Sequence, residues 1–122
     1  MTTASTTAAR IFDLGLSDYE KTRQLQLQMV DKRIAGEAPD TFIFTTHGPT
    51  ITIGRGGGSV NVLVSDEILA QRGVKKYDVE RGGDVTFHGP GQQVIYPIVD
   101  LDQRGRDLHK FLRDLEEVVI LL

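Results

Sequence analysis

The spacing of apolar residues in the first third of the chain predicts a strand followed by a helix. A short apolar strand runs from Ile11 to Ser17, and Ser17 with Glu20 forms a capping box, the polar pair that often starts a helix. The apolar residues that follow share one helical stripe, made of Leu27, Val30 and Ile34. Gly36 and Pro39 end this helix, because glycine accepts a left-handed cap and proline cannot continue a helix.

The next part of the chain predicts a core strand and a glycine-rich loop. Thr41 to Thr46 is β-branched or aromatic throughout, with three large apolar residues in a row, as expected of a strand buried on both faces. His47-Gly-Pro49 interrupts this strand, and a brief strand resumes from Ile51 to Ile53. Gly54 to Gly58 then forms a loop of high backbone freedom.

A short helix and three strands are predicted next. Ser65 caps the helix, which ends near Gly73. The three strands are separated by turns at Gly82-Gly83 and Gly89-Pro-Gly91, and span Val74–Glu80, Asp84–His88 and Gln93–Asp100. Successive strands joined by tight turns favour a meander of adjacent antiparallel strands.

The last segment predicts an amphipathic helix. Its apolar residues recur every three or four positions and comprise Leu108, Phe111, Leu112, Leu115, Val118, Val119 and Leu122. The chain stops within this pattern, with no glycine, no basic last turn and no polar closure. We therefore expect residues 11–122 to be the N-terminal part of a single larger domain, incomplete at the C-terminus.

Composition narrows the classes of function. The 122 residues carry 14 basic and 17 acidic side chains, a net charge of −3, so the broad positive field of nucleic-acid binding is missing. No segment reaches the roughly 18 apolar residues of a membrane span and no signal peptide is evident, so a cytoplasmic location is expected. There is no cysteine, which removes thiol nucleophiles from these residues. Residues 1–10 are expected to be a disordered tail, because residues 2–9 offer no large apolar side chain to bury.

The segment from Arg81 to Gln92 carries the clearest chemical pattern. Alternation along its strand places polar residues on one face and apolar ones on the other: Asp84, Thr86 and His88 against Val85 and Phe87. A cationic arginine, two adjacent glycines and a histidine suit binding of a carbonyl or carboxylate beside an apolar chain. A tight hairpin with a solvated polar face is the open alternative.

The other candidate groups have weaker patterns. His88 suits a general acid or base, because imidazole titrates near neutral pH, or else a structural hydrogen bond. His47, in a turn, and His109, at a helix start, lack the spacing of a metal pair, so no metal is expected. Gly54 to Gly58 lacks the ending of a phosphate-binding loop, so no nucleotide cofactor is expected either. The small basic clusters suit either an acidic protein partner or solvent, and comprise Lys75, Lys76, Arg104, Arg106 and Lys110.

The run from Arg81 to Pro97 resembles the signature of the lipoyl(octanoyl) transferases. That signature reads RGG, two residues, T, an aromatic residue and H, followed by GPGQ and YP. Further resemblance lies in Gly15–Tyr19, Pro39-Asp40, His47-Gly-Pro49 with Gly54-Arg55, and Asp107-Leu-His109 with Leu115-Glu-Glu-Val118. The resemblance covers Ile11 to Leu122, nearly the whole chain.

The resemblance implies an α+β fold with a mixed, largely antiparallel sheet flanked by helices, similar to biotin and lipoate protein ligases. It implies transfer of octanoyl from octanoyl-acyl carrier protein to an enzyme cysteine, and then to a lysine of a lipoyl domain. The recipients would be the lipoyl domains of 2-oxoacid dehydrogenases and the glycine cleavage H protein. The implied substrate-binding residues, with glycine amides near the thioester carbonyl, are Arg81, Gly82, Gly83, Asp84, Val85, Thr86, Phe87 and His88.

The chain departs from the family pattern at the catalytic groups. The family's Lys-Ile-Ala-type and Pro-Cys-Gly-type segments have no counterpart in these 122 residues, so no catalytic residue is assigned and the chain alone is expected to be inactive. One alternative is an ATP-dependent lipoate or biotin protein ligase, against which the GPGQ run after His88 speaks. The other is a non-catalytic acyl-binding or protein-interaction module, suggested by the missing thiol.

Overall fold

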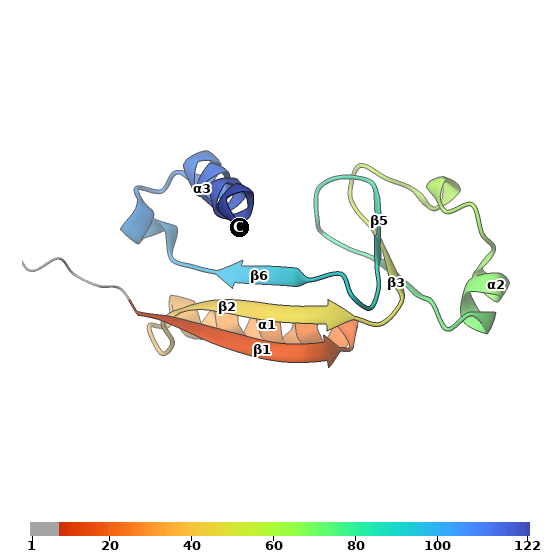
Figure 1. Cartoon of the computed structure of the whole chain (residues 1–122), viewed down its shortest axis with the longest axis horizontal. Helices are drawn as coiled ribbons and strands as arrows, with labels where there is room; N and C mark the ends of the chain where they lie inside the picture. The colour runs from red at the N-terminus through yellow and green to blue at the C-terminus, as the bar shows by residue number, and fades with distance from the viewer. Residues whose placement is uncertain (1–7) are drawn as a thin grey trace, which may run out of the picture.

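The computed structural model describes residues 8–122 and shows an α+β fold (Figure 1). Residues 1–7 of the predicted tail lie outside the described residues, whereas Ala9 and Arg10 already belong to the first strand. The strands are β1 Ala9–Ser17, β2 Asp40–His47, β3 Thr50–Ile53, β4 Lys75–Asp78, β5 Val85–His88 and β6 Val94–Ile98. The helices are α1 Tyr19–Ile34, α2 Asp66–Gln71 and α3 Leu108–Leu121, with short 3₁₀ turns at Ser59–Asn61 and Leu101–Arg104. None of the helices in residues 8–122 combines the length and apolar content needed to cross a bilayer.

The first sheet has the order β1-β2-β6, with β2 at its centre. β1 runs parallel to β2, and β6 runs antiparallel to it. α1 covers one face of this sheet and α3 lies over the other (Figure 1). The core lies on the α1 side and is formed by Met29, Ala38, Ile43 and Ile98.

The predicted core strand is confirmed, but only one of its faces is fully buried. Ile43 points into the α1 core and is inaccessible to water. Phe42 and Phe44 are half-buried, because they face an open apolar groove of about 540 Å³ under α3. The predicted amphipathic helix is also confirmed as α3, although none of its side chains is fully buried.

The second sheet has the order β4-β3-β5, so the predicted meander is wrong. β3 runs parallel to β4 and antiparallel to β5, and β6 pairs with β2 in the other sheet. The strands that flank each glycine turn do not pair with each other. Instead β4 and β5 both pair with β3, and β6 pairs with β2. The α+β class and the mixed pairing are confirmed, but the residues form two mixed sheets in place of one.

The first helix starts one residue later than the capping box predicts. Asp18 is the N-cap, and its carboxylate accepts a hydrogen bond of 3.1 Å from the Lys21 amide. Ser17 ends β1, and its hydroxyl bonds to that of Thr22 at 2.7 Å. Helix α1 therefore buries Thr22 and Met29. The predicted helix is confirmed, but its apolar stripe is 40 to 81% exposed and lies outside the core: Leu27, Val30 and Ile34.

Candidate functional site

A groove of about 470 Å³ lies where the two sheets meet. We call it the junction groove. Its walls come from α1, from β3, β5 and β6, and from the segment that joins β4 to β5. They comprise Tyr19, Arg23, Gln26, Leu27, Thr52, Val79, Glu80, Arg81, His88, Val94 and Tyr96. Of the eight residues implied by the signature, Arg81 and His88 line this groove, so the fold brings the two ends of the predicted segment together in one cavity.

A cluster of aromatic and imidazole rings adjoins the junction groove. The Tyr19 ring lies 5.2 Å from that of Tyr77, 5.3 Å from that of His47 and 6.1 Å from that of His88, measured between centroids. Tyr19 comes from α1 and Tyr77 from β4, so these contacts join the two sheets. The position of His88 therefore depends on how the sheets pack against each other.

His47 belongs to this cluster, and its predicted place in a turn is wrong. It ends β2 and is completely buried. Its Nδ1 lies 3.0 Å from the Ser17 carbonyl oxygen, which only accepts, so Nδ1 donates. In the neutral ring Nε2 then accepts from the Tyr96 hydroxyl at 2.8 Å. Burial raises the pKa of Tyr96 to about 12, so the phenol keeps the proton that it donates.

His88 sits beside this pair in a less polar setting. Its Nε2 lies 3.4 Å from the Thr52 hydroxyl, and its buried Nδ1 has no hydrogen-bond partner within residues 8–122. Burial lowers the pKa of His88 below its ordinary 6.5, and the neighbouring His47 and Arg81 lower it further. The imidazole is therefore neutral at pH 7 and can exchange a proton or a hydrogen bond with a ligand.

Arg81 folds back on its own loop instead of pointing its charge outwards. Its Nη1 donates to the Gly82 carbonyl at 2.7 Å. Its Nη2 donates to the Asp84 carbonyl at 2.9 Å, and to the hydroxyl and the carbonyl of Thr52 at 3.0 and 3.1 Å. Only Nε, which is buried, lacks a partner among the described residues. The guanidinium thus holds the loop in place.

The residues from Arg81 to Asp84, which we call the RGG loop, have engaged carbonyls and free amides. All four carbonyl oxygens accept hydrogen bonds, from the amides of Arg55, Gly56 and Gly54 and from the Arg81 side chain. In the part of the chain that the structure describes, no group accepts from the amides of residues 82–84. Such a loop offers only donors to a ligand, which suits a carbonyl or carboxylate oxygen.

The remaining signature residues lie outside the junction groove. The Asp84 carboxylate accepts from Asn61 Nδ2 at 2.7 Å, so it does not join the polar row of the strand. Thr86 is half-buried on the same strand face as His88, as predicted. Val85 and Phe87 share the opposite face, and Phe87 is 54% exposed.

Sequence reasoning assigned no role to two tyrosines of the groove, Tyr19 and Tyr96. A signal for them existed, because both belong to the segments that carry the family resemblance. This signal does not predict their role, because their contacts join residues far apart in sequence: the Tyr96 hydroxyl bonds to His47, which lies 49 positions away.

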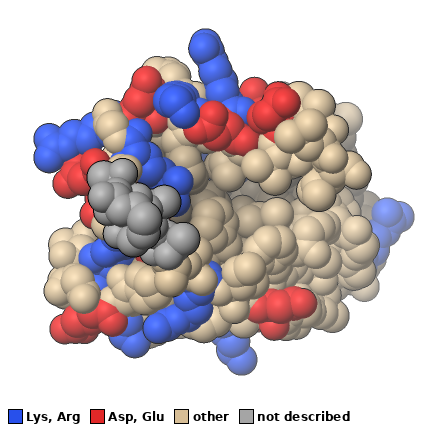
Figure 2. All heavy atoms as spheres, turned by 60° about the vertical axis from the view of Figure 1, so that its left-hand side comes forward, with Lys and Arg blue, Asp and Glu red and all other residues tan. Residues whose placement is uncertain are grey.

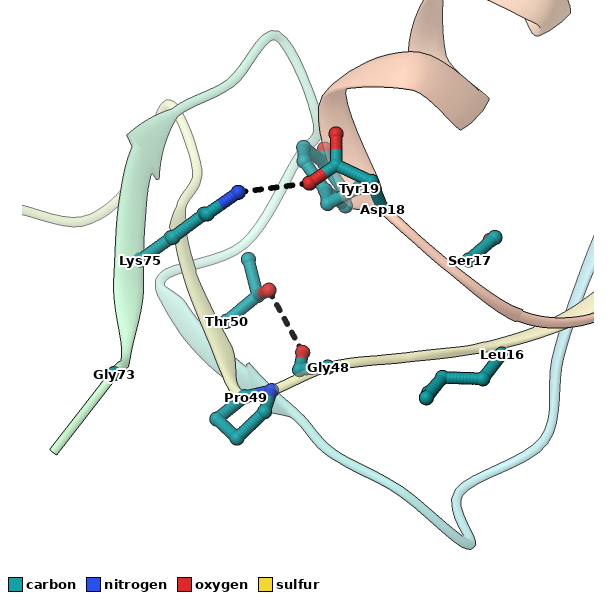
Figure 3. A pocket seen from close by; sticks show the side chains of 9 residues that line it. All are labelled: Leu16, Ser17, Asp18, Tyr19, Gly48, Pro49, Thr50, Gly73 and Lys75. Atoms are coloured by element: carbon teal, nitrogen blue, oxygen red, sulfur yellow. Dashed lines mark hydrogen bonds and ion pairs between the residues drawn. The ribbon is translucent and has the colours of Figure 1, made fainter.

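A smaller hollow of about 280 Å³ adjoins the ring cluster (Figure 3). There the Lys75 ammonium of β4 reaches the Asp18 carboxylate at the start of α1, at 2.8 Å. This ion pair also raises the pKa of Lys75 and lowers that of Asp18, chiefly through their shared hydrogen bond. It is a second link between the sheets, and it engages one of the lysines that the sequence offered to a protein partner.

The other basic residues of the predicted docking clusters are also paired. Lys76 binds Asp66 at 2.6 Å. Arg104, Arg106 and Lys110 bind Asp40, Asp102 and Asp114, at 3.4, 2.6 and 2.8 Å. Figure 2 accordingly shows both signs of charge side by side on one face, without a broad patch of either sign. Within residues 8–122, no group of three or more histidine and carboxylate side chains is arranged to hold a metal ion.

Comparison with known proteins agrees with the signature. The family model described as lipoyl protein ligase A/B catalytic domain matches residues 18–122. Proteins named octanoyltransferase are similar to 89 to 92% of the chain: that of Geobacter metallireducens is 47% identical over 110 residues, that of Alkaliphilus metalliredigens 43% over 112, and that of Caldicellulosiruptor saccharolyticus 50% over 109. The matches cover 48, 51 and 46% of these proteins, so the chain spans about half the length of the curated relatives it matches.

Solved structures share the fold. P. falciparum LipL1 in complex with lipoate aligns with a TM-score of 0.51 and 11% identity, over 72% of this chain and 29% of that one. Protein Ta0514 of T. acidophilum aligns with a TM-score of 0.50 and 16% identity, over 73% of this chain and 36% of that one. Because the family model covers the groove, the RGG loop and most of the chain, the chain belongs to the lipoyl protein ligase A/B catalytic domain family.

Proposed function

We propose that the whole protein containing this chain transfers octanoyl from octanoyl-acyl carrier protein to a lysine of lipoyl domains. Relatives 43 to 50% identical to the chain bear the name octanoyltransferase, which supports this reaction. An enzyme thiol takes the acyl group from the carrier thioester, which releases the carrier thiol. The acyl group then passes to the lysine amine, which forms an amide and releases the enzyme thiol. The thiol is not among these 122 residues, which contain no cysteine.

The observation that carries the proposal is the asymmetry of the RGG loop. Its carbonyls are engaged and its amides are free, so the loop can donate to the thioester carbonyl oxygen and to the negative charge that develops there. Arg81, at the start of this loop, and His88 line the junction groove, where His88 is a neutral donor or acceptor. The alkyl tail would pack on apolar groove residues such as Leu27, Val79 and Val94. Burying it would stabilise the complex by roughly 5 kcal/mol at ~0.8 kcal/mol per CH₂.

The partners follow from the proposed reaction. They are octanoyl-acyl carrier protein as donor, and the lipoyl domains of 2-oxoacid dehydrogenases and the glycine cleavage H protein as acceptors, in the cytoplasm. Acidic partners would dock on Lys75 and Lys76 only by competing with Asp18 and Asp66, which already bind these lysines. Charge attraction at this place is therefore weaker than the sequence alone suggests.

A ligase that joins free acid to the lipoyl domain at the expense of ATP is the second candidate, because the family description covers ligases. Incubating the whole protein with a lipoyl domain separates the candidates when the acceptor's mass is followed. The proposal predicts octanoylation from octanoyl-acyl carrier protein without ATP. Octanoylation only from free octanoate with ATP would establish the ligase, and no octanoylation from either donor would favour a non-catalytic module.

A further inference from the structure

The glycine-rich segment Gly54–Gly57, which we call the brace loop, is bonded along its length to the RGG loop. The amides of Gly54, Arg55 and Gly56 donate to the carbonyls of Asp84, Arg81 and Gly83 at 2.7, 2.9 and 2.9 Å. The Gly57 amide donates to the Gly54 carbonyl at 3.1 Å. Four successive amides are thus engaged within the chain, so the brace loop has none of them left to hold a phosphate.

The close approach of the two loops explains why the brace loop is made of glycine. A Cβ atom at Gly54 would overlap the Gly83 carbonyl oxygen, and would lie 2.9 Å from that of Arg81 and 3.0 Å from that of Gly82. A Cβ atom at Gly57 would overlap the Asp84 carboxylate and lie 2.8 Å from its Cα. At both positions the added Cβ would meet backbone atoms of the RGG loop, so the RGG backbone itself would have to move.

We propose that Gly54, Gly56 and Gly57 are positioning residues for acyl transfer, which hold the RGG loop so that its amides face the acyl carbonyl. This inference rests on the proposed function. The brace loop occupies the carbonyl side of the RGG loop, and this is why only donors remain for a ligand. A Cβ at Gly54 would push the RGG loop by about 1 Å, and a misplacement of that size lowers rates by about 100-fold.

The test is a graded series of alanine variants in the whole protein. Gly58→Ala is the matched control, because its Cβ would meet no atom closer than Val60 Cγ1 at 3.8 Å. Gly56→Ala is intermediate, with a contact of 3.3 Å to the Gly83 oxygen, and Gly54→Ala is the severe case. For octanoyl-acyl carrier protein we expect kcat/KM near wild type for Gly58→Ala, reduced for Gly56→Ala, and reduced about 100-fold for Gly54→Ala.

Two further readouts separate positioning from loss of fold. Each variant's thermal unfolding is recorded, and the amide NMR signals of Gly82, Gly83 and Asp84 are followed as octanoate is added. We expect folded variants whose RGG amide signals respond to octanoate in the same graded order. If Gly54→Ala does not fold, the order of Gly56→Ala and Gly58→Ala decides.

The positioning role would be overturned by a wild-type kcat/KM in Gly54→Ala. If Gly54→Ala does not fold, equal kcat/KM values for Gly56→Ala and Gly58→Ala would overturn it. A wild-type protein that transfers no octanoyl would instead refute the proposed function, so the two failures are distinguishable.

Discussion

Single side chains at the junction of the sheets are tied together by hydrogen bonds that water cannot replace. His47 is completely buried and accepts from the Tyr96 hydroxyl. Tyr96→Phe should therefore leave His47 Nε2 buried without a donor, which costs about 1 to 3 kcal/mol of the free energy of unfolding. Urea denaturation of the whole protein measures this loss. Tyr77→Phe is the matched control, because the Tyr77 hydroxyl has no hydrogen-bond partner within residues 8–122; equal losses in both variants would contradict the assigned pair.

His88 makes stability depend on pH in a defined window. Burial lowers its pKa in the folded protein, so on acidification the unfolded chain takes up a proton first, near its ordinary 6.5. The unfolded state then binds more protons than the folded state, and the free energy of unfolding falls as the pH drops through the ordinary 6.5 toward the lowered pKa of the folded state. His88→Gln should flatten this slope, as measured by denaturation at several pH values. An unchanged slope in His88→Gln would show that other groups cause it.

The roles of these side chains were only partly predictable from the sequence. Arg81 and His88 line one cavity, and the sequence indicates their closeness because they flank one short glycine turn and strand. The buried state of His47 was not predictable, since its partners Ser17 and Tyr96 lie 30 and 49 positions away. The inward fold of the Arg81 guanidinium likewise depends on Thr52, which comes from another strand.

At the scale of elements, Asp40 joins the end of α1 to the segment that leads to α3. Its carboxylate is 1% exposed and lies 2.9 Å from Arg33 Nε, 3.4 Å from Arg104 Nη2 and 2.9 Å from the Asp100 amide. Burial by itself would raise the pKa of Asp40, but the hydrogen bonds from Asp100 and Arg33 outweigh it and lower the pKa below 3.8. The charged form thus stabilises the fold above that pH, and this stabilisation is lost on further acidification.

Asp40→Asn should lower the free energy of unfolding at neutral pH by about 2 to 3 kcal/mol. This is less than the ~3 to 5 kcal/mol of a fully buried pair, because Arg33 and Arg104 keep contact with water. The variant should also lose less stability than wild type below about pH 4. Asp102→Asn is the control, since its ion pair with Arg106 is exposed and should contribute little. If both variants unfold alike in urea, Asp40 does not link these elements.

Individual strands and helices were more predictable from the sequence than the pairing between strands. The spacing of apolar residues identified the core strand and α3, because strand and helix patterns are local properties of the sequence. The period does not say which strand lies next to which, so β4, β5 and β6 were wrongly placed side by side. The apolar stripe of α1 is a related case: Leu27 faces the junction groove and not the core, and no local pattern distinguishes the two.

At the scale of the whole molecule, the contacts described above between the two sheets lie close together, next to the proposed acyl site. The ring cluster, the Asp18–Lys75 ion pair and the junction groove all lie there. The far side of the first sheet carries the open apolar groove under α3, whose side chains Val118 and Val119 are 57 and 66% exposed. Arg81 and His88 line the junction groove and not this apolar face.

The central claim is that the RGG loop holds the acyl carbonyl, and Gly83→Val tests it most directly. Gly83 has a φ of +85°, and a Cβ there would lie 3.1 Å from Arg81 Nη1, so a branched side chain strains the loop and fills the ligand's space. Gly36→Val is the matched control, because Gly36 has a φ of +74° at the end of α1 and no atom within 4 Å of its Cβ position.

The measurement is the rate of octanoyl transfer from octanoyl-acyl carrier protein to a lipoyl domain, followed by intact mass with the whole protein and both variants. We expect a loss of about 100-fold or more for Gly83→Val and near wild-type transfer for a folded Gly36→Val. Near wild-type transfer by Gly83→Val would contradict the assignment of the acyl site to this loop.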